Sequence, residues 1–304
     1  MQKTILITGS NGLLGQKLVH HILNNTSYKL IATSYGKNRI ESRNDFIYES
    51  LDITSLKSIT NVFSKHLPDI VINTAAMTNV DACEDDKQGC DLLNITAVEN
   101  LISVSKLHNS HLIHLSTDFV FDGEDGPYSE NDKPNPLSYY GLSKFKAEEL
   151  IKNSKLNKWS IARTIIVYGI VENMSRSNVV LWAKEALENK QKINVVDDQF
   201  RSPTFADDLA KGCIQIAETG SCGIYHLSGK DIMSILELVQ RVADFYNLDK
   251  SLIKAIKSHT LNQKAKRPPK TGFILDKSRK DFSYKPRSFE DGLKNLEKEL
   301  RLKN

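Results

Sequence analysis

The sequence predicts an α/β fold with a parallel sheet that is covered by helices on both faces. The alternation of its apolar segments and its length and hydrophobic content support this prediction. Short apolar segments of strand length alternate along the first half of the chain with segments of helical periodicity. Strands that are separated by helices are typical of parallel sheets, which are buried on both faces. The chain has 304 residues, of which 40% are hydrophobic, and this is enough for the core of such a sheet and a smaller second domain.

Six apolar segments are the expected strands, and they lie at residues 4–8, 29–33, 46–51, 69–73, 111–115 and 160–167. After Gly169 the pattern changes to a helix around residues 179–187 and a short segment at residues 192–196. We therefore expect a doubly wound sheet of the Rossmann type in residues 1–169 and a smaller substrate-binding domain in residues 170–304. In such sheets, ligands bind beyond the carboxyl ends of the strands.

Composition argues against several classes of partner. The net charge of +4, from 41 basic and 37 acidic residues, is too small to predict a nucleic-acid partner. No apolar segment approaches the roughly 20 residues of a membrane helix, and the first residues do not read as a signal peptide, so we expect no membrane partner and a cytoplasmic location. The four cysteines and eight histidines show no metal-binding spacing, and no metal site is expected.

A glycine-rich turn follows the first expected strand and precedes a helical pattern. Its glycines allow the backbone to turn sharply and to approach a pyrophosphate closely, while the N-terminus of the following helix offers free N–H groups. A merely structural turn is the alternative, but strand, turn and helix in this order favour dinucleotide binding. The candidate cofactor-binding residues of this turn are Gly9, Asn11, Gly12, Leu13 and Gly15.

Tyr140 and Lys144 lie four residues apart in an expected helix, which places a phenol beside an ammonium group. A cation stabilises a phenolate, so we expect Lys144 to lower the pKa of Tyr140 and to make it a proton donor. A solvated helix face is the alternative for this pair. Thr117 supplies a hydroxyl group at the carboxyl end of a strand, whereas strand alternation directs Ser116 to the other face. We expect Asp118 to be a hydrogen-bonded turn residue rather than a second acid.

Together these segments resemble the extended short-chain dehydrogenase/reductase superfamily and, within it, the dTDP-4-dehydrorhamnose reductase family. The resemblance rests on residues 73–84, 116–123, 140–144, 163–169 and 198–204, and it spans nearly the whole chain. It implies hydride transfer from a nicotinamide cofactor to a ketone carbon of a nucleotide sugar, with three catalytic residues, Thr117, Tyr140 and Lys144. Lys144 would also bind the nicotinamide ribose.

The same resemblance implies further binding residues and a more complex domain boundary. Cofactor contacts are implied for Asp52, Ile53, Ala75 and Ala76, and substrate contacts for Thr78, Val80 and Asp81. Segments near residues 205–217 and 224–228 would return to the main sheet. The resemblance is also compatible with a homodimer.

The segment after the second expected strand indicates the type of cofactor. A carboxylate there would bind a free ribose 2′-hydroxyl group, whereas a basic group would bind a 2′-phosphate. Residues 34–39 contain no acid but contain Lys37 and Arg39. We therefore expect NADPH, with one of these two cations on the 2′-phosphate, and NADH is the alternative.

Two arginines are candidates for binding the diphosphate of the substrate, since a guanidinium group binds phosphate through two donors. They are Arg201 and, in the basic stretch at residues 264–270, Arg267, for which a solvated loop is the alternative. Phe119, Ile166 and Arg201 depart from the tyrosine, tryptophan and glycine that the family resemblance leads one to expect. All three should border the sugar, so we expect a nucleoside-diphosphate 4-keto-6-deoxysugar without fixing which one.

Two other functions remain open at this stage. One is an NAD-retaining sugar-nucleotide epimerase of the same fold. The other is a regulatory subunit that binds a cofactor, because the beta subunit of methionine adenosyltransferase resembles this family. Fold alone does not decide between these functions. The intact set of catalytic residues favours the reductase.

Overall fold

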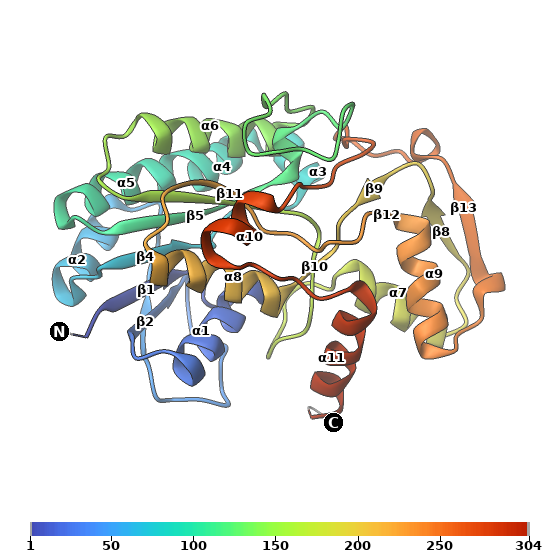
Figure 1. The fold of residues 1–304 in the computed structure, drawn as a ribbon, viewed down its shortest axis with the longest axis horizontal. Helices are drawn as coiled ribbons and strands as arrows, with labels where there is room; N and C mark the ends of the chain where they lie inside the picture. Colours follow the sequence, from blue (N-terminus) through green and yellow to red (C-terminus); the bar gives the residue numbers. More distant parts are fainter. Residues whose placement is uncertain (1, 303–304) are drawn as a thin grey trace.

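The computed structural model describes residues 2–302 and contains a seven-stranded parallel sheet (Figure 1). The strand order is β11-β6-β5-β4-β1-β2-β3, so the first strand lies near the middle of the sheet and the order reverses there. The strands are β1 (Thr4–Thr8), β2 (Lys29–Ser34), β3 (Ile47–Ser50), β4 (Ile70–Asn73), β5 (His111–Thr117), β6 (Trp159–Thr164) and β11 (Gly223–His226). The predicted α/β fold with a doubly wound parallel sheet is confirmed.

One expected strand is divided in the structure. The segment predicted at residues 160–167 forms β6 and, after a break, the short strand β7 (Val167–Tyr168). Between them Ile166 has a φ angle of 28°, a left-handed conformation that a β-branched residue rarely adopts, and the chain turns there. As a result β7 leaves the main sheet and pairs with β10 (Thr204–Phe205).

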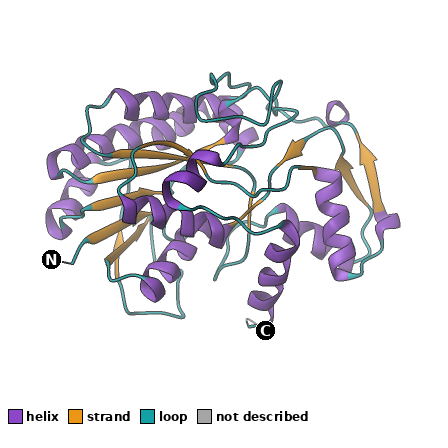
Figure 2. Ribbon diagram, in the orientation of Figure 1, coloured by secondary structure: helices purple, strands orange, loops and turns teal. Residues whose placement is uncertain are grey.

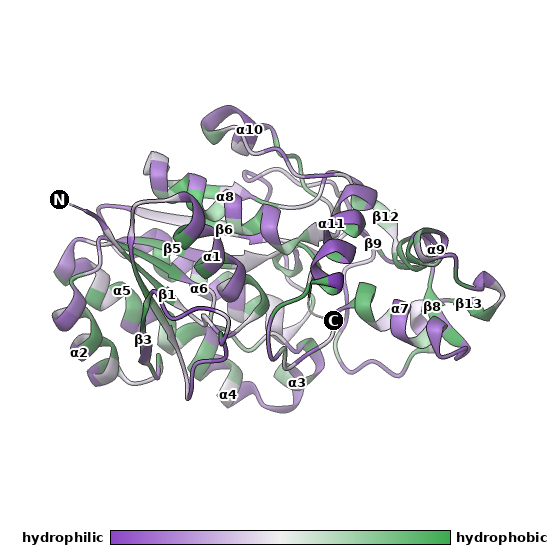
Figure 3. Cartoon of the chain, turned by 90° about the horizontal axis from the view of Figure 1, so that it is seen from below, coloured by the Kyte–Doolittle hydropathy of each residue, from purple (hydrophilic) through white to green (hydrophobic). Residues whose placement is uncertain are grey.

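Helices cover both faces of the sheet, as Figures 1 and 2 show. One layer contains α1 (Leu13–Asn25), α8 (Ala206–Thr219) and α10 (Asp276–Phe282), and the other contains α2 (Leu56–His66), α5 (Ala97–His108) and α6 (Tyr139–Asn153). In β1, Ile5 and Ile7 pack in the first layer and Leu6 packs in the second, as the two-residue period of a strand requires. Figure 3 shows the resulting pattern, with hydrophobic strands between helices that carry hydrophilic outer surfaces.

A second group of elements lies beyond the carboxyl ends of the strands, on the right in Figure 1. Its helices are α7 (Val179–Glu188), α9 (Ile235–Tyr246) and α11 (Phe289–Arg301). Two strand pairs accompany them, β8 (Ile193–Val196) with β13 (Ile253–Ile256) and β9 (Phe200–Arg201) with β12 (Met233–Ser234). These elements have a hydrophobic core of their own around Leu238, Val239 and Leu293.

Two short helices, α3 (Val80–Asp85) and α4 (Lys87–Asp91), follow β4 and border the site described below. Among residues 2–302, no helix is both long and apolar enough to cross a bilayer. The same part of the chain contains no group of histidine, cysteine and carboxylate side chains arranged to hold a metal ion.

A buried ion pair fixes helix α6 to the sheet. Glu148 of α6 accepts hydrogen bonds from Arg163 of β6, at 2.9 Å from Nε and 2.6 Å from Nη2, and from the Ser116 hydroxyl of β5 at 2.5 Å. The side chains of Arg163 and Glu148 are 2% and 1% exposed. Burying two charges is costly, so the pair must remain complete to be tolerated.

We therefore expect Glu148→Gln to reduce the free energy of unfolding by about 3–5 kcal/mol, because it leaves the Arg163 charge buried without a counter-charge. Urea denaturation measures this loss. Glu149→Gln is the matched control: Glu149 is the next residue of the same helix and forms only an exposed pair with Lys152, so the expected loss is below about 1 kcal/mol. Equal losses in the two variants would show that the buried pair does not anchor α6.

Candidate active site

Two adjoining cavities lie at the carboxyl ends of the strands. The central cavity has a volume of about 810 Å³, and the side cavity has a volume of about 610 Å³. They share Asn11, Gly12, Thr74, Ala76 and Ser175 as lining residues, so together they form one continuous cleft. This is the edge of the sheet where parallel α/β folds bind their ligands.

The glycine-rich turn between β1 and α1 forms the floor of both cavities. Gly9 has a φ angle of 70°, and a Cβ atom on Gly15 would lie 2.2 Å from the Gly9 carbonyl oxygen, so neither position accommodates a side chain. Helix α1 begins after Gly12 without a side-chain cap. Its first N–H groups therefore remain available to an anion, such as the pyrophosphate of a dinucleotide.

The structure brings most of the predicted cofactor-binding residues to this cleft. The central cavity is lined by Asn11, Gly12, Leu13, Gly15, Ala76, Tyr140 and Lys144. The side cavity is lined by Gly9, Asn11, Gly12, Arg39, Asp52, Ile53, Ala75 and Ala76. Lys37 lines neither cavity, and only its backbone carbonyl takes part, accepting a hydrogen bond of 2.8 Å from Asn11 Nδ2.

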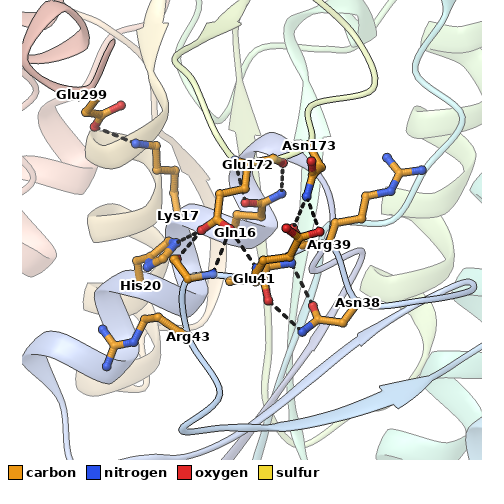
Figure 4. A network of polar contacts seen from close by, with 12 residues as sticks. Gln16, Lys17, His20, Asn38, Arg39, Glu41, Arg43, Glu172, Asn173 and Glu299 are labelled. Atoms are coloured by element: carbon orange, nitrogen blue, oxygen red, sulfur yellow. Dashed lines mark hydrogen bonds and ion pairs between the residues drawn. The ribbon is translucent and has the colours of Figure 1, made fainter. Parts of the chain in front are cut away.

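The loop after β2 is held by two residues of the segment that follows β7, as Figure 4 shows. The Glu172 carboxylate accepts hydrogen bonds from the backbone N–H groups of Glu41 and Ser42, at 2.8 and 3.0 Å. Asn173 donates to the Arg39 carbonyl oxygen at 3.1 Å. The sequence analysis did not single out Glu172 or Asn173, because more than 130 residues separate them from this loop and no local pattern marks them.

These contacts hold the backbone of the loop, and the side chain of Arg39 takes no part in them. Its backbone N–H group donates to Asn11 Oδ1 at 3.0 Å, but its guanidinium group forms no hydrogen bond or ion pair with any residue between 2 and 302. In Figure 4 the guanidinium group points away from the network around Glu172. A cation on a braced loop at the edge of the side cavity is suited to binding a phosphate group.

The three predicted catalytic residues converge on the central cavity. Thr117 ends β5, and Tyr140 and Lys144 lie in the first two turns of α6. Helix α6 begins after Ser138, whose hydroxyl group accepts a hydrogen bond of 3.2 Å from the Gly141 N–H group. A Cβ atom on Gly141 would lie 2.2 Å from the Phe119 carbonyl oxygen. Glycine after Tyr140 therefore lets this helix approach the end of β5.

The pKa of Tyr140 differs from the expected direction. Burial raises it above the ordinary value of 10, and the hydrogen bond with Thr117 opposes this rise only in part. Burial also lowers the pKa of Lys144 to about 8, although the Glu148 carboxylate acts in the other direction. The expectation of a lowered phenol pKa considered only the neighbouring cation and neglected the loss of water around a buried phenol.

Asp118 and Arg201 form a buried pair beside the cavity. Arg201 Nε lies 3.6 Å from Asp118 Oδ2, and Arg201 Nη2 donates to the Pro268 carbonyl oxygen at 2.6 Å. Asp118 also accepts a hydrogen bond from Thr271. Its expected role as a hydrogen-bonded turn residue agrees with these contacts. Arg201 differs from expectation, because its donors face the protein and it does not line the cavity.

Two further residues that were expected to contact the substrate, Arg267 and Asp81, form an ion pair with each other and do not face the central cavity. Arg267 Nη2 lies 2.6 Å from Asp81 Oδ2, and Asp81 also accepts a hydrogen bond from the Ala265 N–H group at 3.0 Å. This pairing ties the basic stretch to helix α3, and hydrogen bonding to Arg267 lowers the pKa of Asp81. Neither residue lines the central cavity.

The remaining substrate candidates do line the central cavity, and the structure adds one cation. Thr78, Val80, Phe119 and Ile166 contribute to its wall. Arg176, from the segment after β7, also lines the cavity and donates to the Thr78 hydroxyl at 2.9 Å. The sequence analysis missed Arg176, since it belongs to no motif and reaches the site only through the fold.

Comparison with known proteins agrees with this arrangement. The family model described as RmlD substrate binding domain matches residues 2–302. The dTDP-4-dehydrorhamnose reductase of Aggregatibacter actinomycetemcomitans is 31% identical and covers 96% of this chain and 97% of that protein. Methionine adenosyltransferase 2 subunit beta of Xenopus tropicalis is 33% identical and covers 83% of this chain and 74% of that protein.

A solved structure extends the similarity to three dimensions. The crystal structure of dTDP-4-dehydrorhamnose reductase from Bacillus anthracis in complex with NADP is similar with a TM-score of 0.85 and 28% identity. The match covers 98% of this chain and 100% of that one. Sequence and fold agree over nearly the full length, and the chain belongs to the dTDP-4-dehydrorhamnose reductase family, within the extended short-chain dehydrogenases/reductases.

Proposed function

We propose that this protein is an NADPH-dependent oxidoreductase that reduces the 4-keto group of a nucleoside-diphosphate 6-deoxysugar. The observation that carries this proposal is the convergence of Thr117, Tyr140 and Lys144 on a cavity that adjoins the glycine-rich turn. The NADP complex of the Bacillus anthracis relative supports the choice of cofactor. The reductase from Aggregatibacter actinomycetemcomitans supports the class of substrate.

The cleft fits a dinucleotide phosphate cofactor. Gly9 and Gly15 leave no room for a Cβ atom where the turn approaches the cavity, and this is the geometry that a pyrophosphate needs. Asp52 and Ile53 would border the adenine, and Arg39 would bind the 2′-phosphate from its braced loop. Lys37 is the weaker candidate for that phosphate, since its side chain lies outside both cavities.

A nicotinamide cofactor, when bound here, would supply the hydride for the ketone carbon. Tyr140 donates the proton to the carbonyl oxygen as negative charge develops there. Its raised pKa keeps the phenol protonated at neutral pH, and the Thr117 hydroxyl orients the carbonyl group beside it. Lys144, whose pKa of about 8 leaves it mostly charged at neutral pH, stabilises the phenolate that remains.

Arg176 is the cation that we assign to the diphosphate of the substrate. It lines the central cavity, whereas the guanidinium groups of Arg201 and Arg267 are engaged by protein carboxylates and carbonyl oxygens. Phe119 and Ile166 supply an apolar wall, which suits a deoxysugar with few hydroxyl groups. Thr78, Val80 and Asp81 would border or support this subsite.

A cofactor-binding regulatory subunit is the second candidate, because the subunit beta of methionine adenosyltransferase is among the relatives. The intact catalytic residues favour turnover, which that role would not require.

We further propose that the protein is a homodimer in the cytoplasm. All four cysteines are free thiols, as expected in a reducing compartment. Light scattering after size exclusion tests the oligomeric state, and cell fractionation tests the location. A monomer or a secreted protein would contradict the respective part.

Tyr140→Phe is expected to reduce turnover on the order of a hundredfold or more, because it removes the proton donor and little volume. Cofactor affinity and unfolding free energy should remain close to those of the unaltered protein. Tyr139→Phe is the matched control, since the Tyr139 hydroxyl group binds Asp91 at 2.8 Å and lies outside the central cavity. Full turnover by the Tyr140 variant would exclude this residue as the acid.

Cofactor preference is expected to depend on Arg39. Fluorescence titration should show tighter binding of NADPH than of NADH, and Arg39→Ala should weaken NADPH about tenfold or more while leaving NADH nearly unchanged, because only NADPH offers the 2′-phosphate. Lys37→Ala, on the same loop, should have the smaller effect. Equal affinity of the unaltered protein for both cofactors would contradict the assignment of this loop.

The substrate assay follows NADPH consumption with dTDP-4-dehydrorhamnose generated in place, and with the UDP- and GDP-linked 4-keto sugars for comparison. We expect consumption of the dTDP compound and release of oxidised cofactor in stoichiometric amounts with product, which an epimerase would not show. If no 4-keto sugar is consumed while the protein co-purifies with another enzyme and alters its activity, the regulatory role replaces the reductase.

A further inference from the structure

A buried histidine lies directly beneath the catalytic lysine. His114 of β5 is 1% exposed, and its Nε2 atom lies 3.0 Å from Lys144 Nζ. On the other side of the ring, Nδ1 lies 3.0 Å from Asn73 Nδ2 in β4. The Oδ1 atom of the same amide lies 2.6 Å from the Thr8 hydroxyl of β1. A chain of contacts therefore runs from the middle of the sheet to Lys144.

The chemistry of these groups determines where the protons lie. A charged lysine only donates hydrogen bonds, so Nε2 of His114 must accept one. The ring itself is neutral, because burial and the neighbouring ammonium group keep the pKa of His114 well below 6.5. A neutral ring that accepts at Nε2 carries its proton on Nδ1. An N–H group needs an acceptor, so the Asn73 amide must be turned by 180° from the orientation in the structure, which places Nδ2 at the ring and Oδ1 at Thr8. In the turned orientation, Oδ1 accepts from Nδ1–H and the NH₂ group donates to the Thr8 hydroxyl.

We propose that His114 is a positioning residue: Asn73 holds its ring in the Nδ1–H form, and its Nε2 atom anchors one N–H group of Lys144. An ammonium group has three donors, and His114 is its hydrogen-bond partner among residues 2–302. Because Lys144 lines the central cavity together with Tyr140, the other two donors would be available to a bound cofactor and to the phenol. The role of Lys144 rests on the proposed function, but the proton arrangement does not.

The same contact helps Lys144 to remain charged. The charged and titratable groups around its ammonium group are His114 of β5, Cys90 of α4, and Tyr140 and Glu148 of its own helix. Burial opposes the charge, and an acceptor at Nε2 supports it. Without that acceptor, the pKa of Lys144 should fall by about one further unit, so that the charge is lost at a lower pH.

The first test is nuclear magnetic resonance of the unaltered protein labelled with ¹⁵N in histidine. Long-range proton–nitrogen correlations near neutral pH should show His114 with Nδ1 protonated and Nε2 unprotonated. The signals are assigned by their absence in the His114→Gln variant. An Nε2–H form, or a doubly protonated ring, would overturn the proposal. This measurement needs neither substrate nor turnover.

The second test compares three variants by NADPH titration across pH. His114→Leu removes the acceptor, whereas His114→Gln replaces it with an amide oxygen. His111→Leu is the matched control, since His111 is buried on the same strand but binds Ser160 Oγ at 2.8 Å rather than Lys144. We expect the alkaline loss of NADPH affinity to shift about one pH unit lower in His114→Leu only.

Identical pH profiles for the two leucine variants would overturn the proposal, even if both are less stable than the unaltered protein. If His114→Leu does not fold, the tautomer and the pH profile of His114→Gln decide the matter, and that profile should match the unaltered protein. The two tests of His114 can succeed or fail independently of the proposed reductase activity. A protein that consumes no 4-keto sugar but shows the Nδ1–H form would overturn the reductase and retain the anchor.

Discussion

The carboxylate of Glu148 is the point on which the active site depends. It joins three elements, because it accepts hydrogen bonds from Arg163 of β6 and Ser116 of β5 while it belongs to α6. These contacts compensate for the burial of two charges. They also set the distance between the helix that carries Tyr140 and the strand that ends at Thr117. The hydroxyl, the phenol and the ammonium group meet in one cavity because this ion pair holds their elements together.

Ion pairing within the protein also separates the basic residues around the cleft into two groups. Arg201 and Arg267 each carry donors that could bind a phosphate group, but both are engaged by carboxylates of the protein, Asp118 and Asp81. They fix the loops around the cavity. The cations that keep free donors, Arg39 and Arg176, are exposed, and they line the side cavity and the central cavity, respectively.

One segment of the chain contacts residues of both cavities. Glu172 and Asn173 hold the loop that carries Arg39, and a few residues later Arg176 donates a hydrogen bond to Thr78 of the central cavity. The loop after β2 and the wall of the central cavity are thus braced by the same stretch of chain, residues 172–176, which belongs to neither the strands nor the helices of the sheet. Both cavities depend on its conformation.

The sequence by itself determined six of the seven strands of the sheet, the glycine-rich turn and the placement of Tyr140 and Lys144 on one helix. These features follow from local periodicity and from the local backbone geometry. At Gly15, for example, a Cβ atom would collide with the carbonyl oxygen of Gly9. Only the tertiary structure decided the partners of Arg201, the bracing by Glu172 and the rise in the pKa of Tyr140. Each depends on burial or on residues far away in the chain, since Glu172 lies 131 positions after Glu41, and no local pattern encodes such proximity.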